Sequence, residues 1–303
     1  MRYVVTGAAG FIGSHLTESL LAAGHDVVGV DCFTDHYDPA VKEENAAGLL
    51  VERVDLAADP LDFDGVDGVF HLAAQPGVRS FGDRFPLYVR NNLLASERVL
   101  EAAARAGVRV VFASSSSIYG EAERYPTPED AVPAPLSPYG ITKLACEQLA
   151  RAFAGSFGLD VVVLRYFNAF GPRQRPDMAF TRIATALAEG RPFELYGDGR
   201  QSRGFTYVGD VVSATEAGMH AGVGTYNVGG GTEASMLDAI RILEQLAGRP
   251  LEVVAGPAVP GDQRRTSADT TRIRTELGWE PRVSLEDGLR AQWEWVSGRV
   301  AAR

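Results

Sequence analysis

Short apolar runs alternate with helix-like stretches through the first half of the chain. Near-continuous apolar runs, typical of strands buried on both faces of a parallel sheet, occupy 2–6, 26–30, 66–73, 108–113 and 159–166. Apolar residues recur at helical spacing between these runs, over 12–24, 87–107 and 137–157. This alternation predicts an α/β fold built on a Rossmann-type, doubly wound parallel sheet with helices on both faces.

The pattern changes from Asn168 onward, where Gly and Pro recur, strands become short and isolated, and helices fill the end of the chain. Ser235 and Asp238, and likewise Ser284 and Asp287, are spaced as in a capping box that opens a helix. We therefore expect two domains, residues 1–168 and a smaller α/β domain at 169–303, with the segment near 205–230 packed back onto the first. A cleft between two such parts, outside the carboxyl ends of the strands, would hold a second ligand.

Three glycines, Gly7, Gly10 and Gly13, separate the first predicted strand from the first helix. A glycine turn lets the backbone approach a ligand closely, and a helix start offers free N–H groups and a positive dipole end, so the turn predicts a bound phosphate. The Gly-x-x-Gly-x-x-Gly spacing departs from the G-x-G-x-x-G fingerprint of the classical dinucleotide fold. Asp31 ends the next strand, where an acid accepts hydrogen bonds from a ribose 2′-hydroxyl and repels a 2′-phosphate, which favours NAD over NADP.

Charge and length narrow the functions that remain. The 303 residues carry a formal net charge of -10, which argues against nucleic acid or an anionic membrane surface as a partner. No apolar run approaches the ~20 residues of a membrane span, and the chain starts one position before a strand, so we expect a cytoplasmic protein without a leader. The two cysteines and five histidines follow no ligand spacing, and we expect no metal site.

One pair of residues has the spacing of a proton-transfer site. Tyr139 and Lys143 are four apart near the start of the helix predicted at 137–157, so both side chains lie on one face. An adjacent ammonium stabilises a phenolate and is expected to lower the pKa of the tyrosine, as a general base for an alcohol proton requires. Ser115 follows the strand at 108–113, where its hydroxyl could bind the same substrate oxygen.

Six motifs, in order along the chain, resemble the extended short-chain dehydrogenase/reductases, the nucleotide-sugar epimerase/dehydratase family. They are TGAAGFIGSHL, Asp31, HLAAQPGVR (71–79), SSSSIYG (114–120), Tyr139-Gly-Ile-Thr-Lys143 and RYFNAFGPRQRPDMAF (165–180). The resemblance implies an NAD that stays bound while hydride leaves and returns to a sugar, with Ser115, Tyr139 and Lys143 as the catalytic trio. It also implies a homodimer built from the helices at 87–107 and 137–157.

The same resemblance assigns the residues around the cofactor. Asp55 is expected near the adenine, 72–74 under the pyrophosphate and ribose, and Asn92 and Tyr166 toward the nicotinamide. The full set implied for NAD is Gly7, Gly10, Phe11, Ile12, Gly13, Asp31, Asp55, Leu56, Leu72, Ala73, Ala74, Asn92, Tyr139, Lys143 and Tyr166.

The loop after Asn168 carries the substrate prediction. RPDMA, together with AAQPGVR and SSSSIYG, resembles the UDP-glucuronate 4-epimerases more than the UDP-glucose 4-epimerases, and arginine binds a carboxylate in a bidentate fork, so Arg175 is the candidate for the C6 carboxylate. The resemblance places Tyr196 on the uracil, Arg203 on the diphosphate and Asp262 on the ribose, with Arg264 or Arg265 on a phosphate. The full set implied for the UDP-sugar is Arg79, Ser115, Ser116, Ser117, Asn168, Arg175, Tyr196, Arg203, Asp262, Arg264 and Arg265.

Other functions remain open. A UDP-glucose or UDP-N-acetylhexosamine 4-epimerase needs no partner for a carboxylate. Dehydratases and decarboxylases that resemble this chain have acidic residues where Ser116 and Ser117 stand, and serine is a poor acid or base, which disfavours both. A catalytically silent NAD-sensing scaffold is disfavoured because such a protein would be free to lose Tyr139 and Lys143.

Overall fold

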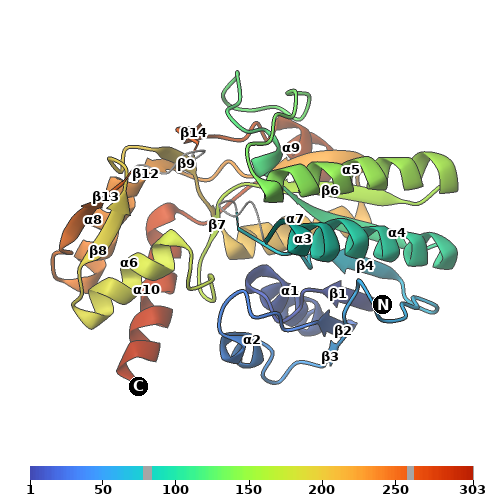
Figure 1. The fold of residues 1–303 in the computed structure, drawn as a ribbon, viewed down its shortest axis with the longest axis horizontal. Coiled ribbons are helices and arrows are strands. Elements are labelled where there is room, and N and C mark those ends of the chain that lie inside the picture. The colour runs from blue at the N-terminus through green and yellow to red at the C-terminus, as the bar shows by residue number, and fades with distance from the viewer. Residues whose placement is uncertain (78–83, 258–262, 303) are drawn as a thin grey trace.

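The computed structural model describes residues 1–77, 84–257 and 263–302, which fold around one large parallel sheet (Figure 1). In the described chain this sheet has seven strands in the order β11-β6-β5-β4-β1-β2-β3. Its strands are β1 (Arg2–Thr6), β2 (Asp26–Asp31), β3 (Val51–Arg53), β4 (Gly68–His71), β5 (Arg109–Ser115), β6 (Val161–Tyr166) and β11 (Gly224–Val228). All neighbours pair in parallel, which confirms the predicted Rossmann-type fold. The strand order reverses between β1 and β4, the place where such sheets bind ligands.

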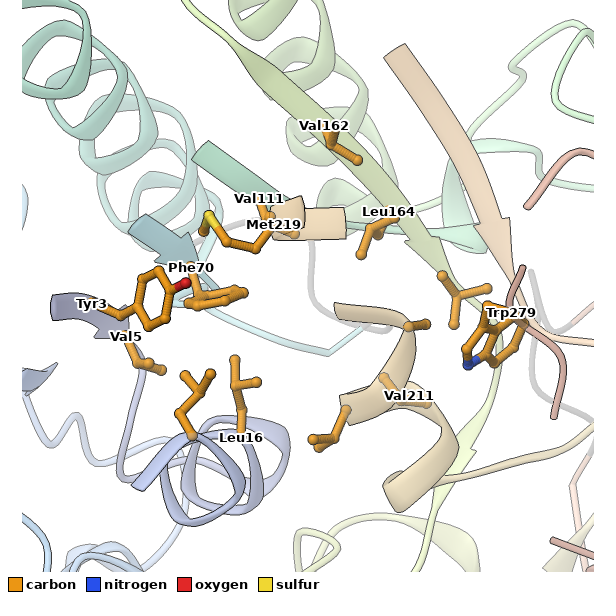
Figure 2. Packing of buried hydrophobic residues seen from close by; sticks show 14 of the residues in the cluster. Tyr3, Val5, Leu16, Phe70, Val111, Val162, Leu164, Val211, Met219 and Trp279 are labelled. Atoms are coloured by element: carbon orange, nitrogen blue, oxygen red, sulfur yellow. The ribbon is translucent and has the colours of Figure 1, made fainter. Parts of the chain in front are cut away.

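Two apolar layers cover the faces of the sheet. On one face, α1 (Phe11–Ala22) and α7 (Val208–His220) pack on side chains of β1, β4, β5 and β6, in a cluster that contains Leu16, Phe70, Val111 and Val211 (Figure 2). On the other face, α4 (Ala95–Ala106) and α5 (Pro138–Phe157) bury a second cluster. Burial on both faces explains why the strands read as continuous apolar runs.

The spacing of the glycines follows from how tightly the first turn packs. Gly7 has φ +72°, and a Cβ on it would lie 2.9 Å from the Cα and N atoms of Ala73 after β4. A Cβ on Gly13 would lie 2.1 Å from the carbonyl oxygen of Gly7, so only glycine lets α1 sit directly on the turn. The departure from the classical fingerprint therefore reflects a tight contact between turn and helix.

The helix predicted over 87–107 is interrupted. It begins as α3 (Phe85–Tyr88), widens into a π-helical stretch at Val89–Leu94, and continues as α4. The sequence pattern also missed two short elements between β2 and β4, namely α2 (Pro39–Asn45) and strand β3. The π-helical stretch contains Asn92, whose position matters below.

The second half forms a smaller body of short strands and helices. In the described residues these strands pair as β10 with β7, β13 with β8, and β12-β9-β14. The bounds are β7 (Ala169–Phe170), α6 (Ala179–Glu189), β8 (Phe193–Tyr196), β9 (Ser202–Gly204), β10 (Thr206–Tyr207), β12 (Glu233–Ser235), α8 (Met236–Ala247), β13 (Val253–Gly256), β14 (Arg265–Thr266), α9 (Thr271–Leu277) and α10 (Leu285–Ala301). Helices α6, α8 and α10 share an apolar core of their own.

Two details of this half follow from its sequence. Ser235 and Asp238 form the reciprocal hydrogen bonds of a capping box at the start of α8, as predicted. At α10, the Asp287 N–H donates to Ser284 Oγ over 3.1 Å. Between β10 and β12 the chain crosses back to the large sheet, since α7 packs on α1 and β11 pairs with β6. Nowhere in the described chain is a helix both long and apolar enough to cross a membrane.

Candidate functional site

A cavity opens where the carboxyl ends of the sheet strands meet the second half of the chain. Of the residues predicted to hold NAD, all except Asn92 line it, and Arg175 of the predicted substrate set lines it as well. Its wall also contains residues that the sequence analysis did not select: Cys32, Thr34, His36, Tyr37, Lys42, Gln75 and Asn91. The cavity thus joins the predicted cofactor site and part of the predicted substrate site.

The start of α1 forms one end of the cavity. Gly10 is the N-cap of the helix, and no side chain caps it. The first backbone N–H groups of a helix have no partner within the helix, and they carry the positive end of its dipole. This uncapped helix start beside Gly7 and Gly13 is suited to the pyrophosphate of a dinucleotide.

Asp31 lies at the end of β2, nearly buried, with its carboxylate held in place. Its Oδ1 accepts from the Phe33 N–H over 2.8 Å and its Oδ2 from the Ala9 N–H over 3.3 Å. The buried ammonium of Lys42 lies 3.9 Å from Oδ1 and donates to Thr34 Oγ1 over 2.9 Å. Asp31 is therefore a fixed acceptor facing the cavity, and Lys42 balances its charge.

Sequence reasoning missed Lys42, although a signal existed. The chain has only two lysines among 29 basic residues, Lys42 and Lys143, and both line the same cavity.

Asp55 and Leu56 line the cavity beyond Asp31. Arg90 donates to both carboxylate oxygens of Asp55, over 3.2 and 2.5 Å, and this hydrogen bonding holds the pKa of Asp55 below its usual value. Asp55 is ionised at neutral pH and already has a cationic partner.

Asn92, unlike the other residues predicted to hold NAD, does not line the cavity. Its side chain is buried, accepts from the Gln75 N–H over 2.6 Å, and donates to the Gln75 carbonyl and to Thr142 Oγ1. Its neighbour Asn91 lines the cavity instead. In the structure Asn92 therefore ties the strand-end segment at Gln75 to the π-helical stretch and to α5.

Tyr139 and Lys143 line the cavity, and Ser115 lies next to Tyr139. Tyr139 shares a hydrogen bond with Ser115, and Lys143 Nζ lies 6.0 Å from the centroid of the Tyr139 ring. Lys143 is fully buried and donates to the Ala113 carbonyl over 2.7 Å. Tyr139 and Lys143 thus lie on one face of α5, as their four-residue spacing predicts.

The pKa values in this trio correct one expectation. Burial raises the pKa of Tyr139, although the nearby Arg175 guanidinium and the Ser115 hydrogen bond oppose this. Burial also lowers the pKa of Lys143, to about 8. Desolvation therefore sets the direction in which the pKa of each group shifts.

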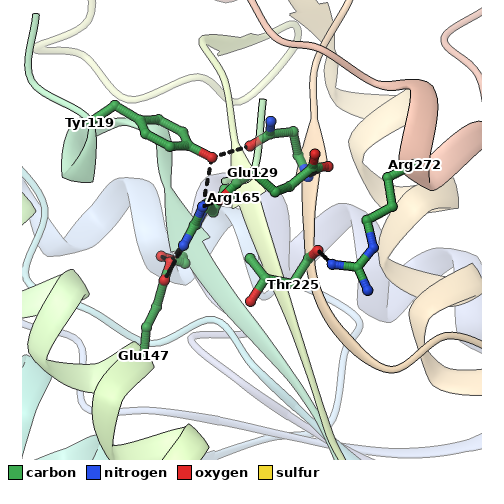
Figure 3. Close-up of polar contacts among 8 residues, drawn as sticks. Tyr119, Glu129, Glu147, Arg165, Thr225 and Arg272 are labelled. Atoms are coloured by element: carbon green, nitrogen blue, oxygen red, sulfur yellow. Dashed lines mark hydrogen bonds and ion pairs between the residues drawn. The ribbon is translucent and has the colours of Figure 1, made fainter. Parts of the chain in front are cut away.

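A buried ionic network joins the elements that carry Ser115, Tyr139 and Lys143. Arg165 on β6 donates to both carboxylate oxygens of Glu147, which lies one turn after Lys143 on α5, and to the Tyr119 hydroxyl over 2.7 Å. Figure 3 shows Arg165 between Glu147 and Tyr119. Glu147 also accepts from Ser114 Oγ over 2.5 Å, so the network reaches the serine beside Ser115. It fixes α5, β5 and β6 relative to one another around the trio.

Arg175 reaches the cavity from the second half of the chain. Its Nε and Nη2 atoms donate, each over 2.9 Å, to the two carboxylate oxygens of Asp177. Asp177 Oδ2 lies 3.9 Å from His36 Nε2 in the first half, and burial lowers the pKa of His36. The guanidinium thus has the bidentate geometry expected for a carboxylate, with Asp177 as the carboxylate it holds in the structure.

A comparison with models of protein families identifies the family of this chain. The model described as the NAD dependent epimerase/dehydratase family matches residues 3–229. The chain belongs to this family.

Several relatives of known name lie within the epimerase/dehydratase family. A Bacillus subtilis protein named as an uncharacterized UDP-glucose epimerase, YtcB, is 40% identical, with 98% of both chains covered. A UDP-glucuronate 4-epimerase of Thermodesulfobacterium geofontis is 36% identical, with 98% of this chain and 97% of that protein covered. The crystal structure of UDP-glucuronic acid 4-epimerase from Bacillus cereus in complex with UDP-glucuronic acid and NAD matches with a TM-score of 0.95 and 39% identity, over 99% of this chain and 100% of that chain.

Four more residues are predicted to bind the substrate: Ser116, Ser117, Arg79 and Asp262. Ser116 is buried beside Ser115. The Ser117 N–H donates to Ser115 Oγ, and Ser115 Oγ donates to the Ser117 hydroxyl. Arg79 and Asp262 lie outside the described residues.

In the second half, Asn168 donates to Thr266 Oγ1 over 2.6 Å, and on the paired strands Thr266 lies opposite Arg203. Arg265 forms a bidentate ion pair with Glu233, over 2.7 and 2.9 Å.

Two other residues predicted to bind the substrate, Tyr196 and Arg264, also lie in the second half. Tyr196 ends β8, with the Arg182 guanidinium 5.4 Å from its ring centroid, and the Arg264 N–H donates to Glu121. Asn168, Arg203 and Arg265 thus come together at the small β12-β9-β14 sheet. Within the described parts of the chain, no group of three or more His, Cys, Asp or Glu residues gathers as a metal site would.

Proposed function

We propose that this protein is a UDP-glucuronate 4-epimerase that interconverts UDP-glucuronate and UDP-galacturonate. The observation that carries the proposal is that Arg175 lines the same cavity as Tyr139 and Lys143, close enough for its charge to oppose the burial that raises the pKa of Tyr139. An arginine fork beside a tyrosine base suits a sugar with a carboxylate at C6 and a reacting hydroxyl at C4. The UDP-glucuronate 4-epimerases among its relatives support the same substrate.

The residues at the uncapped helix start fit NAD. Gly7, Gly10 and Gly13 with the first N–H groups of α1 would hold the pyrophosphate, and the fixed carboxylate of Asp31 would accept from the adenosine ribose hydroxyls. When bound, NAD supplies the acceptor and donor of the C4 hydride.

The serine, tyrosine and lysine have separate roles in this reaction. Tyr139 takes the proton of the C4 hydroxyl, and Ser115, which shares a hydrogen bond with Tyr139, holds the same oxygen. Lys143, with a pKa of about 8, is mostly charged at pH 7 and stabilises the phenolate. The sugar, oxidised to a 4-ketone, turns about its diphosphate bond so that hydride returns to the opposite face.

The 4-ketone creates a hazard that gives Arg175 a second role. A C6 carboxylate next to C5 of a 4-ketone is a β-keto acid, which loses carbon dioxide when the breaking bond aligns with the carbonyl π system. A rigid guanidinium fork that holds the carboxylate out of this alignment protects the intermediate. In this reaction the substrate carboxylate takes the place of Asp177 in the guanidinium fork.

The second half of the chain holds the UDP in this proposal. Tyr196 packs on the uracil, Asp262 binds the ribose, Arg203 binds the diphosphate, and Arg264 or Arg265 completes the phosphate contacts. The pairing of β9 with β14, which carry Arg203 and Arg265, supports a shared phosphate site. A fixed UDP lets the sugar swing without leaving, which is the use of a separate nucleotide-binding part.

We further propose the domain division at 168/169, a homodimer and a cytoplasmic location. The exposed Leu87, Leu94 and Ile141 on α3, the π-helical stretch and α5 support a dimer face on these helices. The free thiols of Cys32 and Cys146 fit a reducing compartment. Sedimentation equilibrium tests the dimer.

A UDP-glucose 4-epimerase is the second candidate, since the Bacillus subtilis relative is named as an uncharacterized UDP-glucose epimerase. The two functions separate in one experiment that compares turnover of UDP-glucuronate and UDP-glucose by NMR of the products. We expect the higher kcat/KM with UDP-glucuronate, and Tyr139→Phe as the inactive control. Turnover of UDP-glucose alone would assign the second function, and formation of UDP-pentose alone would assign a decarboxylase.

A further inference from the structure

Four consecutive residues before Arg175 are each tied to another element. The Gly171 N–H donates to Gln292 Oε1 on α10 over 3.1 Å, and the Pro172 carbonyl accepts from His15 Nε2 on α1 over 2.9 Å. Arg173 forms an ion pair with Glu18 on α1 at 2.6 Å. These contacts reach the loop from both halves of the protein.

The fourth residue, Gln174, is buried and bonded on both sides of its amide. Its Nε2 donates to the Ala169 carbonyl over 3.1 Å, and its Oε1 accepts from Gln292 Nε2 over 2.9 Å and from the Thr181 N–H over 3.2 Å. The loop is therefore fixed to α6 and α10 through side-chain amides.

Two backbone conformations show that this shape is imposed. Arg173 has φ +62°, a left-handed value that is uncommon outside glycine, and Gly171 has φ +138°. Such conformations persist when surrounding contacts determine them. For Arg173 the contact is Glu18, and for Gly171 it is Gln292.

Gln292 does not serve the packing of its own helix. The other buried residues of α10 are Leu285, Gly288, Leu289 and Val296, all apolar, and Gln292 has an exposed fraction of 0%. A buried amide costs free energy unless its hydrogen bonds are made. The bonds of Gln292 go to Gly171, Gln174 and Thr181, so its amide serves the loop.

We propose that Gln292 and Glu18 are positioning residues that set the selectivity of the enzyme for a uronate. They hold the backbone of 171–174 against α10 on one side and α1 on the other, and so fix where the guanidinium of Arg175 meets the C6 carboxylate. The inference rests on the proposed function. It adds that selectivity depends on a helix near the end of the chain, more than a hundred residues from Arg175.

The test measures both substrates and the products. Gln292→Leu keeps an apolar fit in α10 and removes the amide, and Glu18→Ala removes the support from α1 at a half-exposed position. Glu286→Gln, in the exposed pair with Arg290 on α10, is the matched control. Folding is checked by circular dichroism and by binding of NAD.

We expect each variant to lower kcat/KM for UDP-glucuronate on the order of 10-fold more than for UDP-glucose, since small misplacements of a binding group are costly. The fraction of UDP-pentose among the products should rise, and Glu286→Gln should match the wild type. An equal loss with both substrates, or no loss, in a folded Glu18→Ala protein would overturn the positioning role while leaving the proposed function intact. A wild type that turns over UDP-glucose but not UDP-glucuronate would overturn the proposed function, and the positioning role with it.

Discussion

We predict that Lys143, for which a catalytic role is proposed, lowers the stability of the protein. Burial lowers its pKa from 10.5 to about 8, which corresponds to about 3 kcal/mol of penalty on the ammonium at pH 7. Methionine at this position has a similar length and no charge. It loses the hydrogen bond that the charged ammonium donates to the Ala113 carbonyl, worth about 2 kcal/mol. Lys143→Met should therefore stabilise the protein by about 1 kcal/mol while it removes activity.

The pH dependence gives the sign an independent check. Between pH 8 and 10.5 the unfolded chain binds the proton of Lys143 and the folded protein does not, so the wild type gains stability as pH rises through this window. The difference in free energy of unfolding between Lys143→Met and the wild type should become smaller over the same pH range.

The assay is urea unfolding at several pH values on protein freed of dinucleotide, because a bound ligand adds its own stabilisation. Lys42→Met is the contrast, since it removes the partner of the buried carboxylate of Asp31 and should destabilise. A Lys143→Met protein that is less stable than the wild type at pH 7 would refute this reasoning.

Three further predictions concern ligands. Arg175→Ala should raise KM for UDP-glucuronate by about 10- to 100-fold, as expected for the loss of a bidentate charged pair, and should leave KM for UDP-glucose little changed. The variant should also release UDP-pentose. Steady-state kinetics with NMR of the products checks this, and unchanged kinetics with UDP-glucuronate would exclude the carboxylate assignment. Asp31→Ala should reduce the preference for NAD over NADP by about 10-fold, measured by calorimetry, and an unaltered preference would remove Asp31 from the ribose site. Tyr139→Phe should lower kcat by about 10²- to 10⁴-fold while NAD still binds, and substantial remaining turnover would require another base.

The fold could be predicted from the chain because its signals are local. Continuous apolar strands and helical periodicity fix the sheet, and the glycine turn is explained by contacts between Gly7, Gly13 and Ala73. The pairing of Tyr139 with Lys143 is a helix spacing, and it too could be predicted. The π-helical stretch was missed because a widened turn leaves the apolar pattern unchanged.

The details of the site could not be predicted, because they depend on contacts between distant segments. Asp177 fills the fork of Arg175, and Arg90 pairs with Asp55; neither pair has a signature in the spacing of residues. The raised pKa of Tyr139 depends on how deeply the cavity buries it, which an adjacent lysine in the sequence does not reveal. Gln292 reads as one more polar residue of a terminal helix until its partners are known.

The central claim is that Tyr139 and Arg175 act on one UDP-uronate through oxidation and reduction at C4. The most direct test is to incubate the purified protein with UDP-glucuronate that carries deuterium at C4 and to follow the product by NMR. We expect UDP-galacturonate that retains the deuterium at C4, since the hydride that leaves C4 is the one that returns to it. Loss of the deuterium to solvent, or an unchanged UDP-glucuronate beside active turnover of UDP-glucose, would contradict it.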